Sequence, residues 1–186
     1  MNKLTSFTLA ALLLAPLSAL AAGDLPITNR LNPASPFQRV AYDDAGEATL
    51  QPHLIDGQDW VFKNAGDATP AARSCVFGYT IRFGYSSLKA GAAYKVRLTL
   101  FADEVRTIRV KAGQTVLGEA KAENGKTSTA EFDIPAAARK GADLNLTIEH
   151  ITGPNAVVSE IEILSDDPAP LTARSQPTLG THQLGQ

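Results

Sequence analysis

The residues of this chain that could most readily do acid–base chemistry are carboxylates, and they occur in adjacent pairs. The pairs are Asp43 with Asp44, Asp103 with Glu104, and Asp166 with Asp167. Hydrolysis of a glycosidic bond needs two carboxyl groups that face each other across that bond. Neighbouring residues of a β-strand point to opposite faces, so adjacent acids in strands diverge. The pairing therefore argues against a glycosidase.

The other side chains that could do chemistry also lack the spacing that catalysis requires. The histidines, His53, His150 and His182, show no metal-ligand spacing, and there is no G-x-S-x-G turn to present a serine nucleophile. The only cysteine, Cys75, lies in an alternating apolar run, which is typical of a buried and unreactive thiol. We therefore expect no enzyme activity.

Carboxylates in the first third of the chain could serve a structural metal ion instead. Calcium takes oxygen ligands, and the residues that could supply them are Asp43, Asp44, Glu47 and Asp56. Their spacing does not match a fixed calcium-binding loop, so a structural calcium is a hypothesis for this group. No other cofactor is expected.

The first 22 residues predict where these groups would work. Lys3 precedes an apolar run from Leu9 to Leu17, and Ala19-Leu20-Ala21 forms a small-x-small cleavage site. This pattern is typical of a secretory signal peptide, and the apolar run is too short to span a bilayer. We expect residues 1–22 to be removed and the product to be secreted or periplasmic.

The charge balance excludes some partners. The chain has 17 Lys and Arg against 19 Asp and Glu, and removal of Lys3 with the signal leaves 16 against 19, a net charge of −3. Such a balance offers no broad basic field for nucleic acid or anionic lipid. We expect neither nucleic-acid binding nor membrane insertion.

Proline and polar residues set the expected boundaries of one folded domain. Residues 23–36 contain Pro26, Pro33 and Pro36 and predict an extended leader, while the proline-containing segment 165–186 predicts a disordered tail. The remaining residues, 37–164, should form the domain.

Within this domain apolar residues recur at every second position, which is the period of half-buried strands. The alternating segments lie within residues 93–101, 107–111, 131–134, 144–149 and 157–164. Further strands are expected at 37–42, 50–55, 59–62 and 75–83, where Phe77, Tyr79, Ile81 and Phe83 would form one wall of the core. About nine short strands without a long helix predict an all-β antiparallel sandwich, most simply a jelly roll.

The second half of the domain also resembles a known family. Residues 88–101 (LKAGAAYKVRLTLF), 106–110 and 113–117 (GQTVL), followed by SEIEI at 159–163, are similar to the malectin-like and galactose-binding-like domains. They also resemble the accessory sandwiches of bacterial glycoside hydrolases. The resemblance covers about residues 84–164 and implies a sandwich that binds carbohydrate through its end loops, commonly without catalysis. The loop aromatics with which malectin binds sugar have no match here.

Strand direction independently predicts where a site would lie. If successive strands alternate in direction, the loops around residues 63–74, 102–105, 123–126 and 151–156 emerge at one end of the sandwich. Loops gathered on a rigid scaffold are where binding residues concentrate. The candidate ligand-binding residues at this end are Trp60, Arg73, Asp103, Glu104, Arg106, Asn124, His150 and Asn155.

These candidates leave two interpretations open. Trp60 is either a stacking platform for a sugar or a core residue, and Asp103, Glu104 and Arg106 either grip hydroxyl groups or form a solvated turn. The first interpretation is a secreted non-catalytic carbohydrate-binding module. The alternative is a structural or adhesion sandwich of the cell envelope that binds a protein partner.

Overall fold

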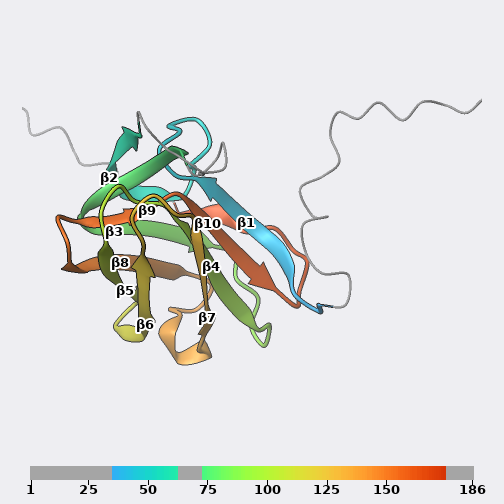
Figure 1. The fold of residues 1–186 in the computed structure, drawn as a ribbon. Coiled ribbons are helices and arrows are strands. Elements are labelled where there is room, and N and C mark those ends of the chain that lie inside the picture. Colours follow the sequence, from blue (N-terminus) through green and yellow to red (C-terminus); the bar gives the residue numbers. More distant parts are fainter. Residues whose placement is uncertain (1–34, 63–72, 175–186) are drawn as a thin grey trace, which may run out of the picture.

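The computed structural model describes residues 35–62 and 73–174, which form two antiparallel sheets packed face to face (Figure 1). Eleven strands are present in this part of the chain. They are β1 (Gln38–Asp44), β2 (Leu54–Val61), β3 (Ser74–Ser86), β4 (Tyr94–Leu100), β5 (Arg106–Ala112), β6 (Thr115–Ala122), β7 (Ser128–Ile134), β8 (Leu144–Thr152), β9 (Ala156–Val158), β10 (Glu160–Ser165) and β11 (Thr172–Ala173).

The smaller sheet has the strand order β1-β10-β4-β7. The larger sheet has the order β11-β3-β8-β5-β6, with β2 and β9 also paired to β3. A single turn of 3-10 helix, Ala136–Ala138, follows β7. The all-β jelly-roll prediction is confirmed, with eleven strands instead of nine.

The core forms because the alternating residues of both sheets point into the space between them. In β4 the buried residues are Tyr94, Val96, Leu98 and Leu100, and those of β8 are Leu144, Leu146 and Ile148. Ile108 and Val110 of β5 are fully buried beside them. Each such side chain contributes about 1.5–3 kcal/mol by leaving water, which is why the period of two is so regular here.

The segment 157–164, predicted to be one strand, is two. β9 pairs with β3 in the larger sheet, and β10 pairs with β1 and β4 in the smaller one. Ser159, between them, donates its backbone N–H to the Thr99 carbonyl at 2.9 Å and accepts the Ala45 N–H at 2.9 Å. The chain therefore crosses from one sheet to the other without a loop, and Val157 and Val158 are both buried.

The predicted strands at 50–55 and 59–62 are instead one strand, β2, which pairs with β3 near both of its ends. From Asp56 to Gln58 β2 advances two residues, whereas the partner positions in β3, Arg82 and Phe77, are five residues apart. The extra residues make β3 bow away from β2 around Tyr79. Gly57, with φ +151°, lies inside the bow against Val76, where a side chain would collide.

The bow corrects the expected core wall. Ile81 and Phe83 are fully buried as predicted, but Tyr79 is 74% exposed and Phe77 is only partly buried. An insertion in one strand of a pair changes which face the following side chains reach. The strict alternation of the sequence does not reveal it.

The domain also extends beyond its predicted end at residue 164. Ser165 closes β10, Leu171 is buried and donates its N–H to the Val40 carbonyl at 2.9 Å, and β11 pairs with β3. The first ten residues of the predicted tail therefore pack on the sandwich. The predicted signal peptide, most of the leader and residues 175–186 lie outside the described residues.

The connections between strands gather at two opposite ends (Figure 1). β2 and β9 lie at one end, where Ala102 forms a bridge with Asn124 and the turn at Gly153 touches Val105. At the other end Gly113, between β5 and β6, lies against Ala138 after β7. The loops at 102–105, 123–126 and 151–156 thus lie at one end, as strand direction predicts, whereas most of the predicted loop 63–74 lies outside the described residues.

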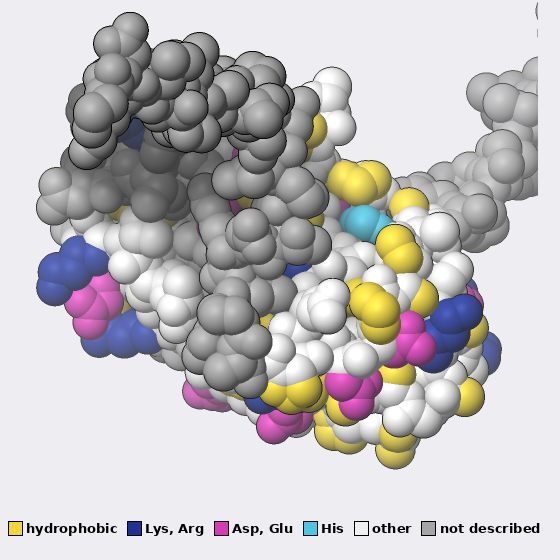
Figure 2. All heavy atoms as spheres, turned by 90° about the vertical axis from the view of Figure 1, so that its right-hand side faces the viewer, with side chains coloured by type: hydrophobic (Ala, Val, Ile, Leu, Met, Phe, Trp, Pro, Cys, Tyr) yellow, Lys and Arg dark blue, Asp and Glu magenta, His cyan; other side chains and the backbone are white. Residues whose placement is uncertain are grey.

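Acidic and basic side chains are interspersed on the face of the molecule drawn in Figure 2. This distribution agrees with the near balance of charges in the sequence. No helix in the described ranges is long and apolar enough to cross a membrane.

Candidate functional site

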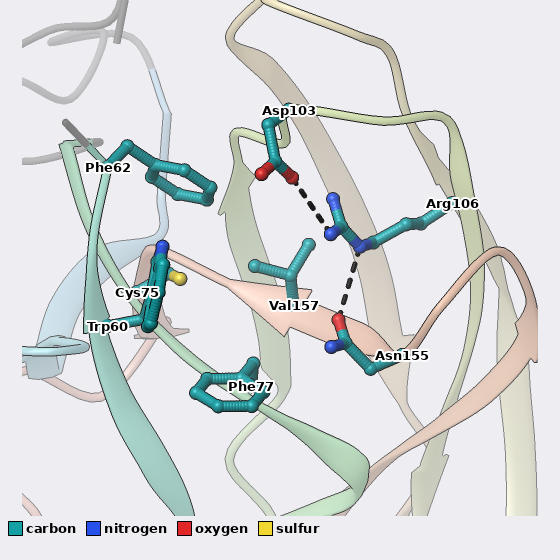
Figure 3. Close-up of a pocket in the computed structure, with 8 residues that line it drawn as sticks. All are labelled: Trp60, Phe62, Cys75, Phe77, Asp103, Arg106, Asn155 and Val157. Atoms are coloured by element: carbon teal, nitrogen blue, oxygen red, sulfur yellow. Dashed lines mark hydrogen bonds and ion pairs between the residues drawn. The ribbon is translucent and has the colours of Figure 1, made fainter. Parts of the chain in front are cut away.

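A cavity of about 170 Å³ opens at the β2–β9 end of the sandwich (Figure 3). Its walls come from the end of β2, from the first residues of β3 and β5, from β9, and from the loops that precede β5 and β9. The described residues that line it are Trp60, Phe62, Cys75, Phe77, Asp103, Arg106, Asn155 and Val157.

One wall of the cavity is polar and is organised by Arg106, the first residue of β5. Its side chain is only 8% exposed, because Arg106 occupies an inward-facing position of β5, in phase with the buried Ile108 and Val110. The guanidinium donates from Nη2 to Asp103 Oδ1 at 2.9 Å, from Nε to Asn155 Oδ1 at 3.1 Å and from Nη1 to the Glu104 carbonyl at 3.3 Å. These acceptors hold the buried cation in one orientation, and Asp103 balances its charge.

The same contacts leave groups for a ligand. Asn155 uses its carbonyl oxygen on Arg106, so its amide nitrogen stays available as a donor among the described residues. Within residues 35–62 and 73–174 Asp103 is bound only through Oδ1, and its side chain is 57% exposed. The wall can therefore both donate and accept hydrogen bonds, which is what a hydroxyl group requires.

The opposite wall is aromatic. Trp60 is 49% exposed and meets Phe77 edge-on, with ring centroids 6.0 Å apart. Phe62 is buried and packs edge-on against Phe101 at 4.9 Å. Figure 3 shows the rings of Trp60, Phe62 and Phe77 across the cavity from the polar wall, with Val157 between the two walls.

Cys75 lies behind the aromatic wall and is 1% exposed. Burial raises the pKa of its thiol to about 12, with Arg106 acting in the opposite direction. The thiol is therefore protonated at neutral pH and unsuited to nucleophilic attack. The prediction of a buried cysteine is confirmed.

The turn that carries Asn155 depends on Gly153. This residue has φ +90°, and a Cβ there would lie 2.7 Å from the Val105 carbonyl oxygen and 2.9 Å from Arg106 Cγ. Only glycine combines that backbone conformation with so close an approach. Gly153 thus lets the turn pack directly on the start of β5 and places Asn155 beside the guanidinium.

The structure brings half of the predicted ligand-binding residues together. Trp60, Asp103, Arg106 and Asn155 line the cavity, and Glu104 contributes its backbone carbonyl.

The remaining predicted residues lie outside the cavity lining. Arg73 is exposed and accepts the Phe62 N–H with its carbonyl, Asn124 is bridged to Ala102, and His150 packs against Tyr79. Phe62, Cys75, Phe77 and Val157 line the cavity but were not predicted to do so. Their apolar alternation predicts that these residues lie in the core. Only the pairing of β2 and β9 with β3 shows that they lie at the cavity.

The four carboxylates considered as calcium ligands do not form one site. Asp43 is fully buried, with Oδ2 accepting the Tyr85 hydroxyl at 2.9 Å and lying 3.0 Å from His53 Nδ1. Asp56 pairs with Arg82 at 2.7 Å. Asp44 lies near Glu47, and burial followed by repulsion from Glu160 and Glu47 raises its pKa. Across residues 35–62 and 73–174 no three His, Cys, Asp or Glu side chains are placed to hold a metal ion.

Comparison with known proteins finds likeness in structure but not in sequence. No protein-family model matches this chain, and no curated protein matches it. Among solved structures, a family 35 carbohydrate-binding module from an environmental isolate matches with a TM-score of 0.50 and 14% identity, covering 74% of this chain and 99% of that chain. A β-glucuronidase of Bacteroides uniformis matches with a TM-score of 0.51 and 11% identity, covering 66% of this chain and 17% of that chain.

A carbohydrate-binding module in complex with calcium and xylotriose is a weaker match, with a TM-score of 0.45 and 10% identity over 67% of this chain and 99% of that chain. It is too distant to bear on a ligand of this protein. The likeness to the enzyme concerns only a part of that enzyme, since the chain covers about a sixth of it. The two matches with a TM-score of 0.50 or more show the fold: the described domain is a jelly-roll β-sandwich, similar in architecture to that carbohydrate-binding module and to one part of the enzyme.

Proposed function

We propose that this protein is a secreted, non-catalytic carbohydrate-binding module that recognises a glycan through the cavity at the β2–β9 end. The observation that carries the proposal is the pairing of an exposed aromatic wall with a fixed polar wall. A sugar ring has an apolar face of C–H groups and an edge of hydroxyls. Trp60 can stack on the first, while Arg106, Asp103 and Asn155 can hydrogen-bond the second.

The size of the cavity supports a single sugar ring. An enclosed apolar cavity of about 150 Å³ holds one benzene molecule. The cavity here, at about 170 Å³, admits one six-membered ring. The ion pair of Arg106 and Asp103 leaves the polar wall without net charge, which favours a neutral sugar.

Two observations favour binding without catalysis. Asp103 is the only carboxylate among the described residues that line the cavity, and it is paired with Arg106 at 2.9 Å. Glycoside hydrolysis needs a second carboxyl group at a distance of about 5–9.5 Å.

Export through the signal peptide at residues 1–22 is part of the proposal, since a glycan-binding module meets its ligand outside the cell.

The test is affinity gel electrophoresis of the purified protein in gels that contain xylan, mixed-linkage β-glucan, galactan or mannan. We expect at least one polymer to retard the protein. In Trp60→Ala the affinity for that polymer should fall about tenfold or more, because the variant removes the stacking surface. Val116→Ala is the matched control: Val116 is 54% exposed but lies on β6, away from the cavity lining. Migration unaffected by every polymer would contradict the proposal and favour the protein-binding alternative.

A further inference from the structure

We propose that Tyr79 forms a second stacking platform beside the cavity, for the sugar unit that follows the one inside it. The inference rests on the proposed function and deepens it, because it makes the ligand a chain of at least two neutral sugar units. It follows from the exposure of Tyr79, from the contacts that hold its ring and from its place beside the cavity.

The first observation is exposure produced by the fold. The Tyr79 side chain is 74% exposed, the largest fraction among the exposed large hydrophobic residues of the described chain. It lies in the bow of β3, where five residues of β3 span two of β2. Without the bow, the alternation that buries Ile81 and Phe83 would carry Tyr79 into the core. The backbone thus presents to solvent an aromatic ring that the sequence pattern would bury.

The second observation is that the exposed ring is held in place. His150 meets Tyr79 edge-on, with ring centroids 5.4 Å apart and an interplanar angle of 90°. The His150 ring is itself anchored, since Nε2 lies 2.6 Å from the Gly153 carbonyl oxygen. A perpendicular neighbour supports the ring and leaves at least one of its faces free of that contact. A ring ordered in advance loses little conformational entropy when a ligand stacks on it.

The third observation places the backbone position of Tyr79 next to residues that line the cavity. In β3 the Phe77 ring lines the cavity, and Tyr79 follows two residues later. The register pairs Gly78 with Ala156, so Tyr79 is adjacent to the position of Asn155, which also lines the cavity. Gly153, which anchors His150, belongs to the same turn as Asn155. One turn therefore supports the polar wall of the cavity and the platform outside it.

Cavity size then decides where a second sugar unit would lie. The volume of about 170 Å³ admits one ring. A neighbouring unit of the same chain must therefore lie outside, along the surface that leads away from Phe77 and Asn155. Tyr79 is the exposed aromatic ring on that path.

The test measures how affinity depends on ligand length. Isothermal titration is carried out with four named series: xylose to xylotriose, glucose to cellotriose, mannose to mannotriose and galactose to galactotriose. For the series that binds, we expect the disaccharide to bind the wild type about tenfold more tightly than the monosaccharide. In Tyr79→Ala that gain should disappear while monosaccharide affinity is unchanged. Tyr79→Phe, which keeps the ring, should retain the gain.

Trp60→Ala separates this inference from the proposed function, since it should weaken monosaccharide and disaccharide alike. Circular dichroism and thermal unfolding verify that each variant is folded, as expected for the exposed side chain of Tyr79. Equal affinity of the wild type for monosaccharide and disaccharide, or an undiminished gain in Tyr79→Ala, would overturn the platform and leave the cavity intact. Failure of all four series and of the polymer gels would overturn both.

Discussion

At the scale of single residues, burial separates the side chains that hold the fold from those that are available to a ligand. Asp43 and Arg106 are both charged and both buried, at 0% and 6% exposure. Each is surrounded by hydrogen-bonding partners, as buried charges must be. The partners of Asp43 are His53 and Tyr85, themselves buried, so that cluster has no face for a ligand. The partners of Arg106 lie on loops beside an open cavity, so the group around Arg106 has a face that a ligand could reach.

Tyr85→Phe tests the role of the buried cluster. The Tyr85 hydroxyl donates to Asp43 Oδ2 at 2.9 Å, and burial followed by the Asp43 carboxylate holds the pKa of Tyr85 well above its ordinary value. The substitution leaves the ring in place and removes one donor to a buried carboxylate, so we expect the free energy of unfolding to fall by about 1.5–3 kcal/mol. Urea unfolding measures the change.

The same substitution at Tyr79 is the control for this prediction. Its side chain is 74% exposed, and no hydrogen bond of its hydroxyl to another described residue is present. We expect Tyr79→Phe to change stability by less than about 0.5 kcal/mol. Equal effects at the two positions would show that the buried hydrogen bond adds nothing to stability.

At the scale of elements, the sequence predicts strands wherever one face of a strand is buried along its whole length. β4, β5 and β8 meet that condition, and their alternating residues are buried as predicted. β3 and the β9–β10 segment do not, because β3 bows around Tyr79 and the chain changes sheet at Ser159. Both departures depend on pairing between distant segments. No local pattern encodes them, and they set the composition of the cavity wall.

The charged faces of the strands in the smaller sheet form a second ordered feature. Glu131 on β7 pairs with Arg97 on β4 at 2.9 Å and with Lys95 at 3.2 Å. Arg97 also reaches Glu162 on β10 at 3.3 Å, and Glu162 pairs with Arg39 on β1 at 2.9 Å. A row of alternating charges therefore crosses all four strands of this sheet.

The pH dependence of stability tests this row through Glu131→Gln. Burial alone would raise the pKa of Glu131, but hydrogen bonds from Arg97 and Lys95 outweigh it and lower the pKa. A carboxyl with a lowered folded pKa stabilises the fold above its ordinary value of 4.5, and the contribution is lost as the pH falls through the folded value. We expect the variant to be less stable than the wild type at pH 7 by roughly 0.5 kcal/mol, a value discounted for solvent screening.

This difference should shrink as unfolding is repeated at pH values from 7 towards 3. Glu104→Gln is the matched control, since the exposed Glu104 carboxylate forms no ion pair with another described residue. A stability difference for Glu131→Gln that stays constant down to pH 3 would contradict the sign argued for its pKa.

At the scale of the whole molecule, the cavity lies at one end of the sandwich, and the C-terminal segment packs across the edges of both sheets. Residues 165–174 leave β10 in the smaller sheet and reach β3 in the larger one through β11. On the way, Leu171 donates its N–H to Val40 in β1 and buries its side chain. The segment thus connects the two sheets outside their shared core. Its prolines and short polar residues resemble a linker in sequence, which is why composition alone predicted a tail.

Leu171→Ala tests whether this connection contributes to the fold. The side chain is 8% exposed, and its loss removes apolar contacts and leaves a cavity between β1 and the segment. We expect the free energy of unfolding to fall by about 2–3 kcal/mol, the lower part of the range for buried leucines because the site lies near the surface. Leu50→Ala makes the same chemical change at a leucine that is 52% exposed, and its effect should stay below about 1 kcal/mol. If the two variants unfold at the same urea concentration, residues 165–174 rest on the sandwich without stabilising it.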